Sequence, residues 1–428
     1  MGLFLDGSCV MKDYEAKRAR TPEVAEEVRE FYELHPYPPP VDDLDRYKRL
    51  WNDLQRRRVD AHLFWPTESY REDRSVLVAG CGTSQAAKYA LRWPRAKVTG
   101  IDVSANSIRQ TEKLKRKYCL DNLEVHQIAV ERAGELGRRF DHVVSTGVLH
   151  HLSDPDAGLR SLRDVLEPDG SMHLMVYAPY GRAGVYMLQE YCRRLGIGTT
   201  PSEIRDLATS LRAMPQNHPL VPLRNALDFA DEAALADALL HPRDRPYSVP
   251  QLFDFIRDAG LQFGRWLRQA PYLPQCGALA SSPHQPLLIQ LPAPEQYAAV
   301  ELFRGAMIRH SAIVFRNDLP GNAQPIRFDR NTWLDYVPLR MPDTVCVEER
   351  LPPGAAAVLI NRNHTSTDLY LPVDAKEKKL FDAIDGERTI GEIAREQATS
   401  KTTRVLFERL WQYDQVIFDA SRRHALQN

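Results

Sequence analysis

The sequence predicts an α/β fold in which a doubly wound, mainly parallel sheet carries helices on both faces. Between residues 75 and 180 of the 428-residue chain, short apolar segments alternate with segments of helical periodicity, the order typical of a parallel sheet with crossover helices. The apolar segment Val76–Ala79 also leads through a Gly80-x-Gly82 turn into a helix that begins near Ser84. A strand, a glycine turn and a helix in this order are typical of a nucleotide-binding unit.

The glycine turn and a downstream carboxylate together point to a nucleoside ligand. Glycines let the backbone pass close beneath a ligand, and the helix start presents free N–H groups to it. The next strand, Lys97–Ile101, ends in Asp102, about 20 residues after the turn, where a carboxylate can meet ribose hydroxyls. A dinucleotide site would place a third glycine at Gln85. S-Adenosylmethionine has no phosphate and needs only the turn and the acid, although a simple tight turn is the alternative.

The elements before the turn form a predicted N-terminal helical cap over residues 1–70. Helical spacing predicts a helix over 13–35 that begins at Thr21-Pro22 and ends at the proline-rich segment His35–Pro40. A second helix is predicted over 46–63. The proline segment and its neighbours Tyr32 and Tyr37 form either a cover over the ligand or a surface linker, and both interpretations stay open here.

The predicted core then follows in order along the chain. Its strands are expected at 76–79, 97–101, 123–128, 142–145 and 172–177, with helices near 84–92, 105–119 and 155–166. A helix over 249–259, a sixth strand over 261–267, a helix over 294–308 and a seventh, antiparallel strand over 311–315 complete it. Ligands of such sheets bind beyond the carboxyl ends of the strands, where the motifs described here fall.

Four motifs in this order carry a resemblance to a known family. They are Val78–Thr83, Ile101–Ser104, Phe140–Leu152 and Leu166–Ser171, the last with Asp169 in place of the first glycine of an L-x-P-G-G turn. The set resembles class I S-adenosylmethionine-dependent methyltransferases of the methyltransferase-domain superfamily. The resemblance implies a Rossmann-like, seven-stranded sheet over 71–320, S-adenosylmethionine as cofactor, and methyl transfer as the activity.

The resemblance also implies a set of cofactor-binding residues. The family often has an acidic residue at the end of the third strand, but this chain has Ala129 there, with Glu131 two residues further on. Backbone groups at Ala129 and Val130 remain able to contact adenine. The expected cofactor-binding residues are Gly80, Cys81, Gly82, Thr83, Gln85, Asp102, Val103, Ala129, Val130 and Gly147.

A histidine pair, His150 and His151, follows the fourth strand, where a methyl acceptor would lie. A histidine can take a proton from an oxygen, nitrogen or sulfur nucleophile near neutral pH, because its ordinary pKa is about 6.5. We expect His151 to be the general base and His150 the second candidate. The alternatives are a packed histidine beside the helix cap at Asp154, or methyl transfer that needs no base.

The segment 181–250 is predicted to be an insertion on the substrate side, because it is rich in Pro, Asn, His and Asp. Its polar residues gather at 228–231 and 241–248, an arrangement that resembles large bacterial methyltransferases of unassigned substrate. A helix cap and a surface turn are the alternative interpretation. The expected substrate-binding residues are Tyr37, Tyr177, His241, Arg245 and Tyr247.

Residues 321–428 are predicted to form a smaller α+β domain after the boundary segment 319–325. Strands are expected at 345–348, 356–360 and 369–371, and helices at 375–385, 390–397 and 402–419. The segment Phe381–Ile393 weakly resembles small winged-helix modules of peptide-modifying pathways. Thr389 and Glu392 also form a capping-box pattern. We expect a structural or dimerisation role, or a protein partner bound through 326–428.

The amino-acid composition limits the classes of partner that the chain is expected to bind. The 56 Lys and Arg residues balance 57 Asp and Glu residues, which argues against a general nucleic-acid or anionic membrane surface. Six scattered cysteines without a C-x-x-C pair suggest neither zinc nor disulfides, and reduced thiols favour a cytoplasmic protein. We expect no metal, no membrane span and a small-molecule or peptide substrate. A tRNA methyltransferase, or a non-catalytic cofactor-binding scaffold acting through its C-terminal domain, are the alternatives.

Overall fold

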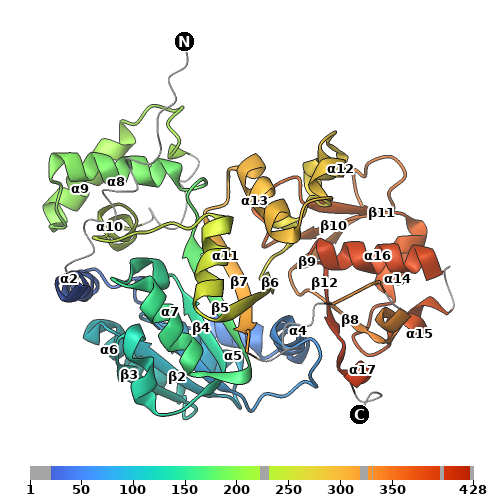
Figure 1. The fold of residues 1–428 in the computed structure, drawn as a ribbon, viewed down its shortest axis with the longest axis horizontal. Coiled ribbons are helices and arrows are strands. Elements are labelled where there is room, and N and C mark those ends of the chain that lie inside the picture. Colours follow the sequence, from blue (N-terminus) through green and yellow to red (C-terminus); the bar gives the residue numbers. More distant parts are fainter. Residues whose placement is uncertain (1–20, 222–230, 319–325, 330, 396–399, 425–428) are drawn as a thin grey trace.

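The computed structural model describes residues 21–221, 231–318, 326–329, 331–395 and 400–424. Within these ranges seven strands form one mixed sheet in the order β3-β2-β1-β4-β5-β7-β6 (Figure 1). β7 runs antiparallel to both β5 and β6. The predicted fold class is thereby confirmed. The strands are β1 Ser75–Ala79, β2 Lys97–Asp102, β3 Leu123–Gln127, β4 Phe140–Thr146, β5 Leu166–Tyr177, β6 Leu261–Trp266 and β7 Arg309–Arg316.

Two apolar cores lie on the two faces of this sheet. Val76 and Val78 of β1 belong to one core and Leu77 and Ala79 to the other, because successive strand side chains point to opposite faces. The first core packs against α3 Asp45–Trp51, α4 Leu54–Phe64, α5 Gln85–Arg92 and α6 Ala105–Tyr118. The second packs against η1 Val130–Leu136, η2 Leu149–His151, α7 Pro155–Asp164 and α11 Val249–Asp258.

The N-terminal helices differ from the prediction in one respect. α2 spans Thr21–Leu34 and so begins at the predicted Thr21-Pro22, whereas residues 13–20 lie outside the described residues. The single helix predicted over 46–63 is wrong, because α3 ends at Trp51 and α4 begins at Leu54. The Asp53 carboxylate accepts the backbone N–H groups of Gln55 and Arg56 and so starts a new helix.

The insertion forms a small helical layer beside α2. Its helices are α8 Ala183–Leu195, α9 Pro201–Arg212 and α10 Glu232–Leu240, and their apolar side chains share a core with Phe31 of α2. The four helices lie together at one end of the sheet (Figure 1). Residues 228–230 of the predicted polar motif lie outside the described residues, whereas Asp231 caps α10 through the Ala234 N–H.

Between the insertion and the C-terminal unit, short elements lead into and out of the last two strands. These are η5 Ala270–Tyr272, η6 Gly277–Ser281, α12 Gln285–Leu288 and α13 Ala293–Arg304. α13 ends at Gly305, which has a positive φ of 59°, so this helix is shorter than the predicted 294–308. The predicted boundary segment 319–325 lies outside the described residues.

In the described part of the C-terminal unit there are two small antiparallel sheets, β11-β10-β9 and β12-β8. The predicted helix over 402–419 is wrong in its second half. α16 ends at Gln412, Asp414 adopts a positive φ of 52°, and Val416–Asp419 forms β12, which pairs with β8. Neither β8 nor β12 was predicted. The elements are η7 Asn331–Asp335, β8 Val337–Arg340, β9 Thr344–Val347, β10 Ala357–Asn361, β11 Tyr370–Val373, α14 Ala375–Asp382, α15 Ile390–Ala394, α16 Ser400–Gln412, β12 Val416–Asp419 and α17 Ser421–His424.

The C-terminal unit packs directly on the sheet domain. Leu339 and Ile417 belong to the same apolar core as Phe64 of α4. The buried Asp414 carboxylate accepts the backbone N–H groups of Gln269 (3.2 Å) and Ala270 (3.0 Å), just after β6. No helix in the described ranges is long and apolar enough to cross a membrane.

Candidate active site

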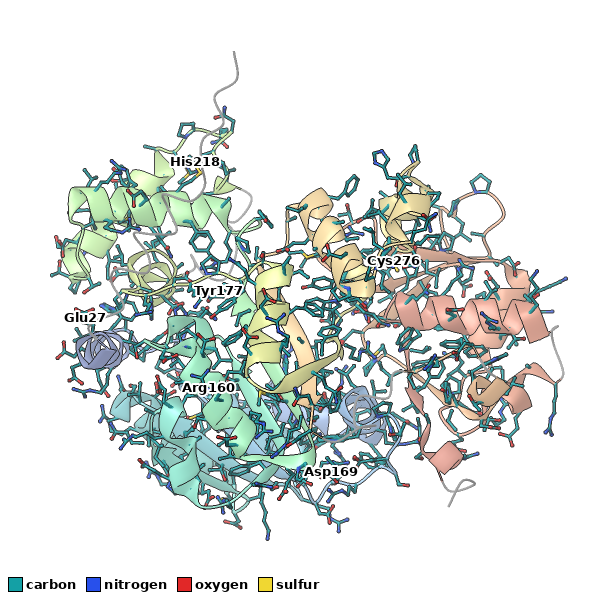
Figure 2. The ribbon with its side chains drawn as sticks, in the orientation of Figure 1. Glu27, Arg160, Asp169, Tyr177, His218 and Cys276 are labelled. Atoms are coloured by element: carbon teal, nitrogen blue, oxygen red, sulfur yellow. The ribbon has the colours of Figure 1, made fainter. Side chains whose placement is uncertain are left out.

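A cavity of about 830 Å³ opens at the carboxyl ends of β1, β2, β4 and β5. Its size lies toward the upper end of the range for small-molecule sites. Residues of α2, α10 and the proline segment also line it, so the predicted N-terminal cap and the insertion meet at this place. Tyr177, at the end of β5, lies between the sheet and the insertion helices, whereas Asp169 lies at the opposite end of β5 (Figure 2).

The glycine turn forms the floor of the cavity. Gly80 and Gly82 both have positive φ angles, 69° and 53°. A Cβ atom at Gly80 would lie 2.3 Å from a methyl carbon of Val148, and one at Gly82 would lie 3.1 Å from Cδ of Pro38. The turn is pinned to β2, because the N–H groups of Gly80 and Cys81 donate to the Ile101 carbonyl. Glycine is therefore required at position 80 by both backbone angle and space.

Asp102 lines the same cavity and is held rigidly. Its carboxylate accepts the N–H of Gly82 (2.8 Å) through one oxygen and the N–H of Ser104 (2.9 Å) through the other. Burial raises the pKa of Asp102, and these amide N–H groups oppose that shift. A carboxylate has about four acceptor positions, so lone pairs remain for a ligand with two hydroxyl groups.

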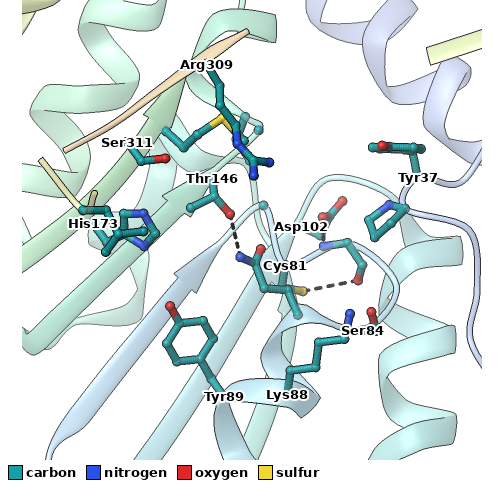
Figure 3. Close-up of a pocket in the computed structure, with 18 of the residues that line it drawn as sticks. Tyr37, Cys81, Ser84, Lys88, Tyr89, Asp102, Thr146, His173, Arg309 and Ser311 are labelled. Atoms are coloured by element: carbon teal, nitrogen blue, oxygen red, sulfur yellow. Dashed lines mark hydrogen bonds between the residues drawn. The ribbon is translucent and has the colours of Figure 1, made fainter. Parts of the chain in front are cut away.

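The remaining predicted cofactor residues fall into two groups. Cys81, Gln85, Val103, Ala129, Val130 and Gly147 line the cavity together with Gly80, Gly82 and Asp102. Glu131 lines it too, which supplies a carboxylate near the position where Ala129 replaces the expected acid. Thr83 is not part of the lining: its hydroxyl donates to the Pro38 carbonyl at 2.8 Å. The Gln85 amide donates to Oγ1 of Thr146 at 2.6 Å and spans the cavity floor (Figure 3).

The proline segment covers the glycine turn. Tyr37 and Pro38 line the cavity, and the Tyr37 carbonyl would lie 3.2 Å from a Cβ at Gly82. Thr83 anchors the segment through the hydrogen bond to Pro38. Of the two interpretations left open by the sequence, a cover rather than a surface linker describes this geometry.

The two histidines of the pair have different surroundings. His151 lines the cavity, and its Nδ1 lies 2.7 Å from the Arg243 carbonyl oxygen. A carbonyl only accepts, so Nδ1 carries the proton and Nε2 keeps its lone pair. Burial lowers the pKa of His151, which keeps the ring neutral at pH 7. His150 is fully buried outside the lining, and neither ring nitrogen has a hydrogen-bond partner among the described residues.

The predicted substrate-binding residues are brought together only in part. Tyr37 and Tyr177 line the cavity. The His241 ring packs against His151, with centroids 4.0 Å apart, but His241 does not line the cavity. The placement expected for His241, Arg245 and Tyr247 needs correction, because none of the three lines the cavity.

The backbone explains where Arg245 and Tyr247 lie. The Arg245 N–H donates to the His150 carbonyl and the Tyr247 N–H to the Tyr177 carbonyl, so this segment runs beside the end of β5. The Arg245 side chain is exposed. Tyr247 is buried against Phe255 of α11, with ring centroids 4.9 Å apart.

Three residues of this region, Asp237, Arg182 and Asp244, were missed as site residues. The Tyr32 hydroxyl donates to Asp237 of α10 at 3.1 Å, and both line the cavity. Arg182 also lines it, 3.5 Å from the buried Asp244 and stacked over the Tyr177 ring. Asp237 could have been found from the sequence, because it is a lone acid inside the apolar run Ala234–Leu240. An acid in such a run is rarely buried unless it has a partner.

The spacing of His151, Asp237 and His241 resembles that of metal ligands, but their donor set does not fit. Their candidate ligand atoms lie within 4.8 Å of one another. Nδ1 of His241 accepts the Arg243 N–H at 3.0 Å, so neutral His241 carries its proton on Nε2. That nitrogen offers a hydrogen-bond donor rather than a lone pair, and we assign no metal here.

Comparisons with known proteins agree with this geometry. A family model described as a methyltransferase domain matches residues 77–172. An uncharacterised protein of Synechococcus sp. is 31% identical over 253 residues, covering 56% of this chain and 59% of that protein. A tRNA U34 carboxymethyltransferase of Shewanella amazonensis is 35% identical over 125 residues, 29% of this chain and 36% of the enzyme. This chain thus spans less than two thirds of each of these relatives.

A solved structure shares the fold over most of the chain. PKMT2 from Rickettsia typhi in complex with AdoHcy (S-adenosylhomocysteine) superposes with a TM-score of 0.62 at 15% identity, covering 90% of this chain and 77% of that one. The glycine turn, the pinned Asp102 and the covered cavity fit S-adenosylmethionine. Residues 77–172 therefore form a class I methyltransferase domain, whose cofactor is S-adenosylmethionine.

Proposed function

We propose that the chain is a methyltransferase that acts on a small-molecule or peptide-borne nucleophile, with His151 as general base. The observation that carries this proposal is the position of His151. It lines the same cavity as Asp102 and the glycine turn, and its Nδ1–H donates a hydrogen bond to the Arg243 carbonyl.

The cofactor side of the cavity would hold S-adenosylmethionine by its adenosine. Asp102 would accept from the ribose hydroxyls, while Val103, Val130 and Glu131 would contact the adenine. When bound, the cofactor supplies a methyl group on a positively charged sulfur, which is electrophilic. Gly80 and Gly82 allow the backbone to lie close to it.

His151 would hold the acceptor and take its proton. The ring lines the cavity and Nε2 has a lone pair, to which an O–H, N–H or S–H of the acceptor would donate. As the acceptor loses its proton, the imidazolium forms with Nδ1–H still bonded to the Arg243 carbonyl. Asp244 favours that charged state, whereas burial opposes it. The His151 ring is therefore neutral at pH 7, able to accept the acceptor's proton, and able to release that proton to solvent afterwards.

The cover over the cavity would exclude water from the reacting atoms. Tyr37 and Pro38 close one side, and the Tyr32–Asp237 hydrogen bond joins α2 to α10 across the other. Excluding water strengthens the electrostatic interactions inside and protects the nucleophile from solvation. Opening would require the separation of α2 from α10.

An RNA substrate is the second candidate, because several relatives are tRNA U34 carboxymethyltransferases. Their similarity is confined to 24–29% of this chain, and the balanced charge of −1 lacks the basic excess of an RNA surface. The non-catalytic alternative loses part of its basis, because Glu131 lines the cavity beside Ala129 and Asp169 lies at the far end of β5.

A methyl-transfer experiment tests the proposal. The full chain is incubated with S-adenosylmethionine carrying a radiolabelled methyl group and with separate small-molecule, peptide and RNA fractions of a cell extract. We expect label in the small-molecule or peptide fraction, and a loss of about 100-fold with His151→Gln, the size typical of a general base. AdoHcy affinity should stay within twofold. Label in RNA alone, or equal transfer by His151→Gln, would contradict the proposal.

A further inference from the structure

The cavity continues past the cofactor side, along the face of the sheet that carries α4 and α5. Thr146 of β4 separates the two parts, because β1 and β2 lie on one side of β4 while β5 and β7 lie on the other. Figure 3 shows Asp102 and Tyr37 on one side of the Gln85–Thr146 hydrogen bond, and His173 and Ser311 on the other. We call the second part the inner chamber.

The inner chamber is built from four regions that are distant in sequence. β5 and β7 supply one wall, α4 and α5 the opposite wall, and the segments after β6 and after β8 close the end. Its residues include Phe64 of α4, Tyr89 of α5, His173 of β5, Ser311 of β7, Arg268 and Met341. The cofactor motifs leave this space unexplained.

Positive charge in the inner chamber exceeds negative charge. Two of its arginines have acidic partners: Arg92 lies 3.5 Å from Asp60, and Arg56 lies 3.7 Å from Asp343. Two further cations line it, Arg268 and Arg309, and no ion pair joins either of them to a carboxylate of the described residues. Arg309 points into the cavity from the start of β7 (Figure 3).

The polar groups of the chamber are short of partners as well. Within the described residues, neither ring nitrogen of the nearly buried His173 has a hydrogen-bond partner, and Nε of Arg268 has none. Buried polar groups are normally satisfied, so unpaired donors around a cavity indicate a ligand that supplies acceptors. Burial lowers the pKa of His173, and the nearby Arg92, Arg268 and Arg309 lower it further.

Aromatic and apolar side chains form the rest of the wall. Trp51, Phe64 and Tyr89 line the chamber together with Leu63 and Leu267. A small inorganic anion would not cover these surfaces. A ligand with an apolar or aromatic body and an anionic end would match both kinds of wall.

We propose that the inner chamber binds the anionic end, a carboxylate or a phosphate, of a methyl acceptor whose body is aromatic or apolar. This inference rests on the proposed function, because it assigns a substrate class to the same cavity. Arg268 and Arg309 would bind the anion, with His173 and Ser311 beside it. The reacting atom of the acceptor would then lie past Thr146 and Met175, toward His151.

Matched probes test the charge requirement on the AdoHcy-loaded full chain. The probes are 2-naphthoate, 2-naphthyl phosphate and the uncharged 2-naphthylmethanol, with affinities from ligand-observed NMR. We expect one of the two anions to bind at least about fivefold more tightly than the alcohol, because charge-assisted hydrogen bonds are the stronger ones. Their order separates a carboxylate site from a phosphate site. Equal binding of all three probes would overturn the proposal.

Paired variants locate the site. Arg268→Met with Arg309→Met should weaken binding of the anionic probe about tenfold or more, since hydrogen bonds to charged groups are worth this much each. The control pair, Lys113→Met with Arg160→Met, removes two exposed cations and should change it less than twofold. Ser311→Phe, which fills the chamber, should abolish probe binding, with circular dichroism confirming the fold.

AdoHcy titrations of the same variants distinguish the two proposals. If the chamber serves the acceptor, the Arg268 and Arg309 variant keeps its AdoHcy affinity within twofold. A tenfold loss of AdoHcy affinity, or displacement of AdoHcy by 2-naphthoate, would assign these cations to the cofactor's own carboxylate and overturn the inference. If the wild-type chain binds no AdoHcy yet binds the anionic probe, the proposed function fails while the anion site stands.

Discussion

The two sides of the cavity are built in opposite ways. The cofactor side comes from one continuous stretch, because Gly80, Gly82, Asp102 and Ser104 lie within 25 residues and meet through backbone hydrogen bonds. The acceptor side is assembled from segments far apart in the chain. Tyr32 meets Asp237 across 205 residues, and His151 meets Arg243 across 92.

This difference separates the part of the cavity whose shape is set by the local backbone from the part whose shape depends on packing between distant segments. Under the proposed function, backbone amides and glycine angles would recognise adenosine with few side chains, so substitutions there should act directly on cofactor binding. The acceptor side depends on side chains supplied by α2, the insertion and the C-terminal unit, so its shape depends on how those parts pack. Mutations that disturb one side while sparing the other are the means to test this contrast.

The largest effect is expected at the contact between the C-terminal unit and the sheet domain. Asp414 is buried, and it binds the Gln269 and Ala270 amides, Arg265 and His364. Asp414→Asn leaves buried cations and donors without their anion, so the free energy of unfolding should fall by about 3 kcal/mol. Hydrogen exchange should rise around Arg268, while AdoHcy affinity changes less than threefold. Asp121→Asn, at an exposed site, is the control.

The next effect should be confined to the cofactor side. Gly80→Ala forces a side chain into a positive φ and onto Val148, so AdoHcy affinity should fall on the order of 100-fold. Titration calorimetry measures the affinity, and binding of the anionic probe should persist. Gly134→Ala, where an added Cβ meets nothing within 4 Å, is the matched control. Equal losses of affinity for AdoHcy and for the anionic probe would show that the two sides of the cavity are not independent.

The smallest effect concerns acid stability and should come from the acceptor side. Burial lowers the pKa of His150, His151, His173 and His241, in the case of His173 to about 3. Below pH 6.5 the unfolded chain binds protons that the folded chain does not, so stability falls as the pH drops from 6.5 toward these lowered values. Each histidine contributes up to about 1.4 kcal/mol per pH unit.

A single variant isolates one of these contributions. His173→Gln should remove about 1 kcal/mol of the stability lost between pH 6.5 and 5.5, measured by denaturant unfolding. His126→Gln, at a half-exposed site on β3, is the control substitution. An unchanged slope in His173→Gln would mean that His173 is accessible to protons in the folded chain.

The sequence was sufficient for the cofactor side because its information is local. A buried strand, a turn that only glycine can form and an acid at the end of the next strand determine that geometry without help from distant residues. The order of strands and helices followed from the same periodicity. The break between α3 and α4 also has a local signal, the helix-capping residue Asp53, but this signal lies within a long stretch of helical periodicity.

The residues of the acceptor side could not be predicted from the sequence, because backbone pairing between distant segments determines which side chains reach the cavity. Arg245 and Tyr247 have the residue types of a binding site, yet backbone bonds to His150 and Tyr177 direct one to solvent and the other into the core. The pairing of β8 with β12 joins segments almost 80 residues apart and turns the end of a predicted helix into a strand. The inner chamber exists only because such distant parts meet.

The most direct test of the central claim is the affinity of the full chain for AdoHcy, measured by titration calorimetry with and without Asp102. If adenosine is held by this carboxylate above the glycine turn, the wild type should bind at a single site, and Asp102→Ala should bind at least about tenfold more weakly, since bonds from hydroxyls to a carboxylate are lost. Asp121→Ala should match the wild type. Absence of binding by the wild type, or equal binding by Asp102→Ala, would contradict the account.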